Sequence, residues 1–391
     1  MATPNATIAE VTSLVTKGTT PTTLGRAFTS QGIGFIKAEC ISSDGSLITE
    51  KQVYIDGDTD QLLKRSRLQK DDILFSIAGV IGRTALVHQD ALPANTNQAI
   101  AILRPDTSKI IPRFLYYTVR AKEFQDHSLG HVVQTAQANV SLGVLSAAPI
   151  WLPPLPTQRR ITGILSAYDE LIDNSKRRIK ILESMARALY REWFVHFRFP
   201  GHESVSLVAS PLGEIPQGWE VRKLLELTKV NYGKNLPTKK LAENGAFPVY
   251  GAAKIIGNYT EYTREHRTII CGCRGSVGEM QITQPRCFVT NNSFTFDPVH
   301  PSSYFWLFHA LKERGLRDIV GGSAQPQITL EGMSSIEIST PPYELRATFQ
   351  DAVSALFEQL WTLDSQIQNL RRTRDLLLPT LISGKLKTDN C

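Results

Sequence analysis

The fold is decided by residues 161–193, which read ITGILSAYDELIDNSKRRIKILESMARALYREW. Apolar and small residues recur along this run by alternating steps of four and three. They are Ile161, Leu165, Tyr168, Ile172, Ser175, Ile179, Leu182, Ala186, Leu189 and Trp193. Steps that average about 3.5 residues indicate the seam of a coiled coil rather than a helix that only lies on a core.

A second run with the same spacing follows 188 residues later. Its seam positions are Phe349, Val353, Leu356, Leu360, Leu363, Ile367, Leu370, Arg374, Leu377 and Leu381. Prolines precede both runs (Pro156 and 341–342), and we expect Pro379 to break the second helix before it stops at Gly384. Two unrelated amphipathic helices, each packed on its own domain, are the alternative. Equal length and identical register favour two partner helices.

The segments that precede the two helices repeat each other. Residues 73–83, ILFSIAGVIGR, match residues 269–279, IICGCRGSVGE, so that Gly79 and Gly82 fall on Gly275 and Gly278. Further matches in the same order are TNQ at 96–98 with TNN at 290–292, and AQANV at 136–140 with AQPQI at 324–328. Their order along the chain indicates an internal duplication.

Short β-branched runs in both segments predict strands, and we expect some helix near 112–124 and 302–313. The fold class that follows is α/β (α+β). We expect two mixed α/β domains joined by two long helices that form an antiparallel coiled coil, with a pseudo-two-fold internal repeat.

Composition limits the class of protein. With 42% hydrophobic and 20% charged residues in a 391-residue chain, two or three globular domains are expected. No apolar run approaches membrane-span length and no secretory signal is expected at the start. Five cysteines predict a reduced, cytoplasmic protein without a disulfide framework. The net charge of +6 permits nucleic-acid binding without requiring it.

Catalytic and metal motifs have weak support. Thr340-Pro-Pro-Tyr343 is similar to the base-gripping loop of amino-methyltransferases, but a helix-start turn is the better interpretation. Cys271-Gly-Cys273 has no second ligand pair at zinc spacing, so a buried strand is expected. The chain has neither a His-Glu-x-x-His motif nor a phosphate-binding P-loop. We therefore expect no catalytic residue and no metal site.

Three runs resemble those of the specificity subunits of type I restriction–modification systems. They are LYREWFVHFRFP at 189–200, GEIPQGWEV at 213–221 and LLLPTLISGKL at 376–386. The resemblance implies a target-recognition domain at 1–155, a spacer helix at 156–200, a second recognition domain at 201–342, and a second spacer helix with the C-terminal tail at 343–391.

The same resemblance implies the partners. The chain would read a split site in double-stranded DNA, one half-site with each recognition domain, and would scaffold two modification (methyltransferase) subunits and the restriction/translocase subunits. No cofactor is expected in this chain, because S-adenosylmethionine, ATP and Mg²⁺ would be bound by those partners. No membrane partner is expected.

Polar loops that recur in both halves are the candidate DNA contacts, since Asn, Gln, Arg and Lys side chains suit base edges and phosphates. In the first domain they are Lys17, Thr19, Thr20, Arg83, Asn95, Asn97, Gln98, Gln134, Gln137 and Asn139. In the second they are Lys234, Asn235, Lys239, Lys240, Arg274, Asn291, Asn292, Gln325 and Gln327.

Three alternatives remain open from the sequence. Features shared by two domains that read different sequences could be scaffold, with base contacts in the parts that differ. The basic run Lys176, Arg177, Arg178 and Lys180 could be a solvated helix face or could contact DNA or a partner. The whole chain could instead be a stand-alone bipartite DNA-binding regulator, or a protein scaffold that does not bind DNA.

Overall fold

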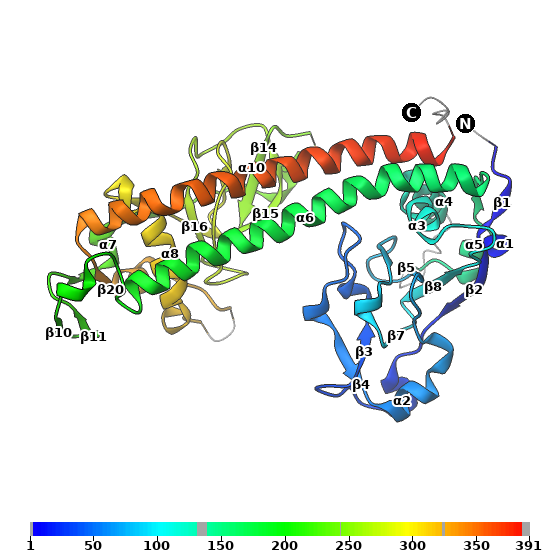
Figure 1. Cartoon of the computed structure of the whole chain (residues 1–391), viewed down its shortest axis with the longest axis horizontal. Helices are drawn as coiled ribbons and strands as arrows, with labels where there is room; N and C mark the ends of the chain where they lie inside the picture. Colours follow the sequence, from blue (N-terminus) through cyan, green and yellow to red (C-terminus); the bar gives the residue numbers. More distant parts are fainter. Residues whose placement is uncertain (1–2, 131–138, 243, 323–324, 385–391) are drawn as a thin grey trace. The chain divides into compact units, whose positions relative to one another are not determined.

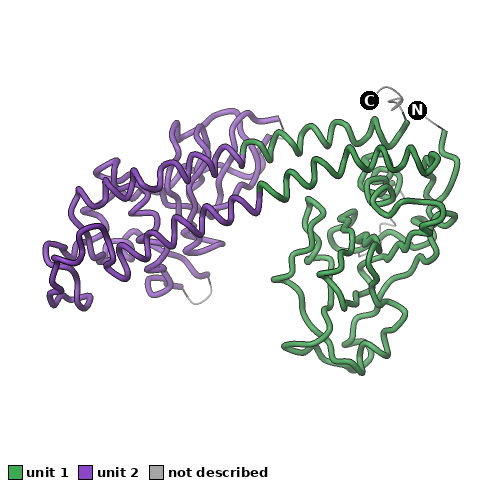
Figure 2. The backbone as a smooth tube through the Cα atoms, in the orientation of Figure 1, with its two compact units in different colours: residues 1–175, 365–391 green, residues 176–364 purple. Residues whose placement is uncertain are grey.

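The structure is a computed structural model that describes residues 3–130, 139–242, 244–322 and 325–384. The chain forms two compact units, residues 1–175 with 365–391 and residues 176–364 (Figure 2). Each unit contains one half of each long helix and one globular part. We call residues 6–150 the first head and residues 220–340 the second head. The four-segment division expected from the sequence stays a prediction.

Two helices of 40 residues carry the seams, α6 (Leu155–Phe194) and α10 (Tyr343–Ile382). In the first unit Ile161 and Leu165 of α6 share a hydrophobic core with Leu378 and Leu381 of α10. In the second unit the start of α10 shares a core with the end of α6. High numbers on one helix meet low numbers on the other in both units, so the helices pair antiparallel (Figure 1).

The seam positions expected from the 3.5-residue spacing are all buried or half-buried. On α6 the buried ones are Ile161, Leu165, Ile172, Ser175, Leu182 and Ala186. On α10 they are Phe349, Val353, Leu363, Ile367, Arg374 and Leu381. Removing an apolar stripe of this length from water is what stabilises two paired helices.

The expectation that Pro379 breaks the second helix was wrong. Helix α10 continues through Pro379 to Ile382, and Gly384 follows with φ of 66°. A proline this close to the helix end removes only one backbone hydrogen bond, and Pro379 itself still accepts a bond from the Ser383 amide at 3.1 Å. The packing of Leu378 and Leu381 in the core holds this last turn in place.

A buried ion pair lies in the seam of the first unit. Arg374 of α10 contacts Asp169 of α6 at 2.5 Å, and the Arg374 side chain is only 8% exposed. The second oxygen of Asp169 accepts a hydrogen bond from the hydroxyl of Tyr117 at 2.6 Å. Burial lowers the pKa of Arg374, but hydrogen bonds and charge from Asp169 and Asp375 outweigh it and hold the pKa above its ordinary value. This network joins both helices to the first head.

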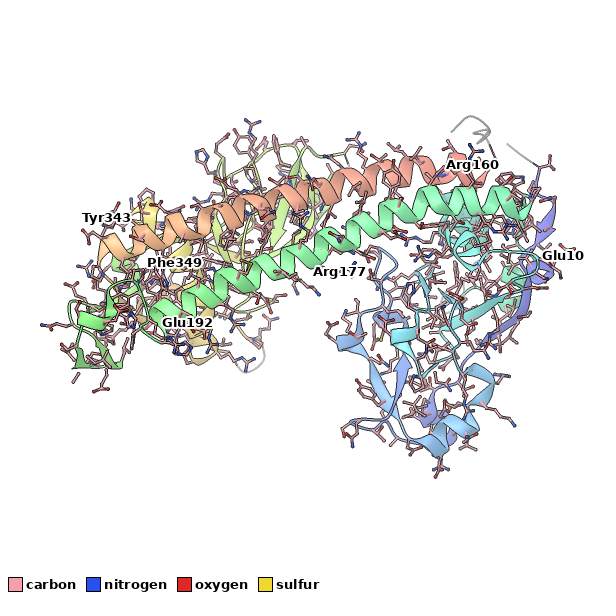
Figure 3. All side chains as sticks on the ribbon, viewed as in Figure 1. Glu10, Arg160, Arg177, Glu192, Tyr343 and Phe349 are labelled. Atoms are coloured by element: carbon pink, nitrogen blue, oxygen red, sulfur yellow. The ribbon has the colours of Figure 1, made fainter. Side chains whose placement is uncertain are left out.

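Aromatic packing takes the same place in the second unit. Phe349 of α10, labelled in Figure 3, is fully buried against three rings of α6. Its ring centroid lies 6.0 Å from Tyr190, 5.8 Å from Trp193 and 5.0 Å from Phe194. These edge-on contacts add to the apolar area that the helices bury.

The first head contains two larger sheets, drawn in blue and cyan in Figure 1. The four-stranded sheet has the order β2-β8-β5-β6, with strands Thr12–Lys17, Ile100–Pro105, Ile73–Ser76 and Thr84–Leu86. The three-stranded sheet has the order β4-β3-β7, with strands Val53–Ile55, Ile33–Ile36 and Ala94–Thr96. The main helices of this head are α1 (Ile8–Val11), α2 (Gly57–Leu62), α3 (Pro112–Arg120), α4 (Lys122–Gly130) and α5 (Leu142–Ala147).

The second head has the same sheets in the same order. Its four-stranded sheet is β13-β19-β16-β17, with strands Thr228–Tyr232, Ser293–Pro298, Ile269–Gly272 and Met280–Ile282. Its three-stranded sheet is β15-β14-β18, with strands Lys254–Tyr259, Phe247–Gly251 and Phe288–Val289. Its main helices are α7 (Leu224–Leu227), α8 (Tyr304–Arg314) and α9 (Leu330–Ser334). The duplication expected from the sequence is therefore confirmed strand by strand.

Each head is closed by a pair of antiparallel strands at its ends. In the first head β1 (Ala6–Thr7) pairs with β9 (Pro149–Ile150). In the second, β12 (Glu220–Lys223) pairs with β20 (Glu337–Thr340). The Pro341-Pro342 step lies between β20 and α10, which agrees with the helix-start interpretation of that motif. A further hairpin, β10 (Leu207–Ser210) with β11 (Gly213–Pro216), precedes the second head.

Among the described residues, no helix combines the length and hydropathy that a membrane span requires.

Candidate nucleic-acid interface

The glycines that match between the two halves form equivalent turns. Gly79 and Gly82 follow β5 with φ of 73° and 87°, and Gly275 and Gly278 follow β16 with φ of 75° and 79°. Side chains other than glycine rarely adopt these values, so the repeated glycines fix a tight turn from β5 to β6 and from β16 to β17. The loops described next meet at the strand ends beside these turns.

In the second head, the end of β13 meets the loop that follows β18. The Asn291 amide donates to the Lys234 carbonyl at 3.1 Å, and the Lys234 amide donates to the Val289 carbonyl at 2.9 Å. Gly233 permits this approach, because a Cβ there would lie 2.3 Å from the carbonyl oxygen of Thr290. The loop that carries Asn291 is thus fixed against the end of β13.

The same loop also meets the end of β16. The Cys273 amide donates to the Asn292 carbonyl at 2.9 Å, and the Ile328 amide donates to the Cys273 carbonyl at 3.0 Å. Arg274, the next residue, forms an isolated antiparallel bridge with Gln327. Four segments that are far apart in the sequence therefore lie together at one edge of the sheet.

Most of the candidate side chains of the second head are solvent-accessible. The exposed ones are Lys234, Asn235, Lys239, Lys240, Arg274, Asn292 and Gln325, and the half-buried ones are Asn291 and Gln327. Lys239 and Lys240 lie on a short 3-10 turn (Thr238–Lys240) that follows the β13 end. Exposed cations and amides such as these can contact phosphates and base edges.

The first head repeats this arrangement. The Gly18 amide donates to the Asn97 carbonyl at 3.1 Å, the Ile77 amide to the Ala99 carbonyl at 2.8 Å, and the Val140 amide to the Ile77 carbonyl at 2.9 Å. Ala78 forms an isolated bridge with Asn139, as Arg274 does with Gln327. The alignment of Asn139 with Gln327 from the sequence is therefore confirmed.

Two side chains of the first head hold its loops together. The side-chain oxygen of Gln98 accepts hydrogen bonds from the hydroxyl and the amide of Thr20, the latter at 3.1 Å. Lys17 and Gln98 are exposed, Thr19, Thr20 and Asn97 are half-buried, and Asn139 is exposed. Gln134 and Gln137 lie outside the described residues.

The structure corrects the prediction for Asn95. This side chain is fully buried. Its amide group bonds to Asp60 at 3.1 Å and to the Leu63 carbonyl at 3.2 Å, and its oxygen accepts from Ser66 at 2.7 Å. All of its polar atoms are used inside the head, so Asn95 is scaffold. Arg83 is half-buried and donates to the Ile41 carbonyl at 2.8 Å, so part of its guanidinium group is used inside the head.

One surface residue was missed from the sequence. Tyr232 ends β13 and is 40% exposed, with its ring 4.5 Å from that of Phe294. The strand registers place Tyr232 opposite Phe294 and Lys17 opposite Ala101, so Tyr232 occupies the position of Lys17 in the other head. The sequence matches did not extend to this strand, although an aromatic residue directly before Gly-Lys-Asn was a usable signal. An exposed aromatic ring can pack against bases or sugars.

Cys271 and Cys273 are buried in the second head. Cys271 lies on β16, as expected, and Cys273 directly follows that strand. Burial raises the pKa of the Cys271 thiol to about 12. Over the described ranges, no three His, Cys, Asp or Glu side chains come together in a way that could hold a metal ion.

The basic run on α6 is mostly exposed. Arg177, labelled in Figure 3, is exposed with Arg178 and Lys180, whereas Lys176 is half-buried. A DNA or partner contact at this run stays a prediction.

The fold and the site define a class: two copies of one α/β head, each with the same polar loop edge, joined by an antiparallel helix pair. The type I restriction modification DNA specificity domain matches this chain at residues 6–184 and 216–369. The chain therefore belongs to the family of type I restriction–modification DNA specificity subunits.

Named relatives are similar over most of their length. The type I restriction enzyme MjaIX specificity subunit of Methanocaldococcus jannaschii is 24% identical, over 85% of this chain and 82% of its own. The HindI specificity subunit of Haemophilus influenzae is 24% identical, over 82% of this chain and 88% of its own. The crystal structure of a type I S subunit from M. genitalium has the same fold, with a TM-score of 0.54, 20% identity and coverage of 97% and 96% of the two chains.

Proposed function

We propose that this chain reads a two-part DNA sequence for a type I restriction–modification complex, one half-site with each head. The observation that carries the proposal is the repeated edge at which polar loops meet, around Lys234, Asn291 and Gln327 in one head and around Gly18, Asn97 and Asn139 in the other. Two copies of one reading surface suit a target with two separate halves.

The chemistry of the complex would belong to other subunits. We propose that this chain scaffolds two modification subunits, which would bind S-adenosylmethionine and methylate adenine, and restriction subunits, which would use ATP and Mg²⁺. The helix pair is the natural scaffold, because its exposed faces include apolar side chains such as Leu171, Ile181 and Met185 that the seam does not use.

The purified chain alone is expected neither to bind S-adenosylmethionine nor to methylate DNA, whereas its complex with two modification subunits is expected to protect a split site. A binding titration with S-adenosylmethionine and a methyl-transfer assay test the purified chain, and methylation mapping of host DNA, with and without the chain, tests the complex. Methyl transfer by the isolated chain would contradict the proposal. Sequence-specific binding without any copurifying modification subunit would favour the alternative of a stand-alone regulator.

The loop edge of the second head can be divided by mutation into base and phosphate contacts. Asn292→Ala or Asn291→Ala is expected to weaken the free energy of binding to the specific site by about 1–3 kcal/mol. Each change is also expected to reduce the base preference at one position of the site. Lys239→Ala is expected to weaken binding to all DNA sequences alike. It is also expected to reduce the slope of log affinity against log salt concentration by about one unit. Binding titrations at several salt concentrations, on specific and random DNA, make the comparison. The half-site of the first head is the internal control, and unchanged binding in all three variants would show that this loop is scaffold.

A further inference from the structure

The two heads differ at a pair of residues that forms an isolated β-bridge just beyond the end of β5 in the first head and of β16 in the second. After β5 the pair is Ala78 with Asn139, and after β16 it is Arg274 with Gln327. Both heads would meet the same sugar–phosphate backbone but different bases. Positions where equivalent loops carry different side chains are therefore better placed to read bases than positions that they share.

The backbone of the Arg274–Gln327 pair is fixed from both sides. Gln327 exchanges two backbone hydrogen bonds with Gly321, each 2.9 Å long, and the next residue, Ile328, donates to the Cys273 carbonyl at 3.0 Å. Gly275, with φ of 75°, turns the chain directly after Arg274. The two side chains therefore start from backbone positions that are held before any ligand arrives.

The two side chains also orient each other. The Nε–H of Arg274 donates to Oε1 of Gln327 at 3.3 Å. Arg274 is exposed and Gln327 is half-buried, so the Arg274 side chain remains open to solvent while it is bonded to Gln327. This bond uses one of the five guanidinium donors. Within the described part of the head no other side-chain hydrogen bond to Arg274 is formed, which leaves its two terminal amino groups for a ligand.

We propose that Arg274, oriented by Gln327, reads a guanine in the half-site of the second head. The two amino groups at the end of a guanidinium match the O6 and N7 acceptors that guanine presents in the major groove. Holding the planar group in one direction reduces the rotamer freedom that binding would otherwise remove. The first head has Ala78 at the position of Arg274 and therefore lacks this arginine–glutamine pair. This inference rests on the proposed function and names one residue of its reading surface.

A phosphate contact is the competing role for Arg274, and two variants separate the roles. Arg274→Ala is expected to weaken binding of the specific site by roughly 10- to 100-fold and to abolish the preference for guanine at one position. Arg274→Lys keeps the charge but loses the planar fork, so it is expected to lose most of that preference while keeping the salt dependence. Gln327→Ala is expected to give a smaller loss of about threefold to tenfold at the same position.

The experiment uses the complex of this chain with its modification subunits. Binding is measured by competition with a set of half-site DNAs, including one set in which each guanine in turn is replaced by 7-deazaguanine, which lacks the N7 acceptor. One such replacement is expected to weaken wild-type binding and to leave Arg274→Ala unaffected. Arg222→Ala is the matched control, because Arg222 is an exposed arginine of the same unit that pairs with Glu220 at 2.7 Å on β12.

The outcomes distinguish this inference from the proposed function. If Arg274→Ala weakens binding of all DNA sequences equally and lowers the salt dependence of binding, Arg274 is a phosphate contact and the inference is overturned. Unchanged binding in Arg274→Ala would also overturn it. If the wild-type complex shows no sequence preference in either half-site, the proposed function fails instead. Retention of the other base preferences in the half-site of the second head shows that this head remains folded in each variant complex.

Discussion

Replacing the first head, residues 6–150, with that of a relative is expected to change one half of the recognised DNA site completely and to leave the other half intact. The change in specificity would span the orders of magnitude that separate specific from non-specific binding, typically about 10³–10⁷. Methylation mapping of the genome of a host that expresses the hybrid complex reads both half-sites at once.

The structure explains why such a graft should fold. The first head has its own buried residues, which include Phe35, Phe75 and Phe114. Among the described residues, its core clusters contain no residue of the second head. Its two ends meet in the β1–β9 pair, where Ala6 lies opposite Ile150. Cutting outside this pair keeps both closing strands with the transferred head, so the graft enters and leaves at neighbouring points.

The reciprocal graft is the matched control. Residues 220–340 are bounded in the same way by the β12–β20 pair, in which Glu220 lies opposite Thr340. Exchanging them is expected to alter only the other half-site. If either graft changes both halves together, or neither, the two heads do not read independently and the two-reader proposal is wrong.

The paired helices could be predicted from sequence because a seam is a local, repeating signal. Ten positions on each helix keep one spacing, and pairing the two helices buries both apolar stripes at once. The duplication was visible for a similar reason, since glycines such as Gly79 and Gly275 are required by positive φ and mark equivalent turns in both halves.

The candidate site was predicted at the level of loops but not of side chains. Asn95, Asn97 and Gln98 lie within four residues, yet Asn95 faces the interior of its head while Gln98 is exposed. Which of them faces inward depends on the parallel pairing of β7 with β3, a contact between distant parts of the sequence that no local pattern encodes. The Arg274–Gln327 pair spans 53 residues in the same way. Pro379 shows the reverse error, because a local rule was overridden by the core that holds the end of α10.

Asp169→Ala is expected to destabilise the first unit by about 3 kcal/mol. The change leaves the Arg374 guanidinium, 8% exposed, in the seam without its partner at 2.5 Å, and it removes the acceptor of the Tyr117 hydroxyl. Breaking a buried ion pair from one side costs about 3–5 kcal/mol. The lower end is expected here because Asp169 is 25% exposed and because Asp375 still accepts from Arg374 at 2.8 Å.

Amide hydrogen exchange followed by mass spectrometry measures this loss where it occurs. Peptides from α3 and from the 155–175 part of α6 are expected to exchange roughly a hundredfold faster in Asp169→Ala, as about 3 kcal/mol implies. Peptides from the core of the second unit, around Phe349, are the internal control and are expected to be unchanged. Asp169→Asn, which keeps an acceptor for Tyr117 but not the charge, is expected to lie between the wild-type protein and the alanine variant.

Adding Arg374→Leu to Asp169→Ala is expected to restore most of the lost protection. Arg374 occupies a seam position, where a leucine would extend the core that already contains Leu165 and Leu378, without any charge to desolvate. Replacing a buried ion pair with well-packed apolar residues is often neutral or stabilising, whereas removing one partner alone is costly. The double variant should therefore be more stable than Asp169→Ala alone. A double variant that is as unstable as the sum of its two single changes would show that Arg374 is held by something other than its pair with Asp169, and that the seam does not accept an apolar residue there.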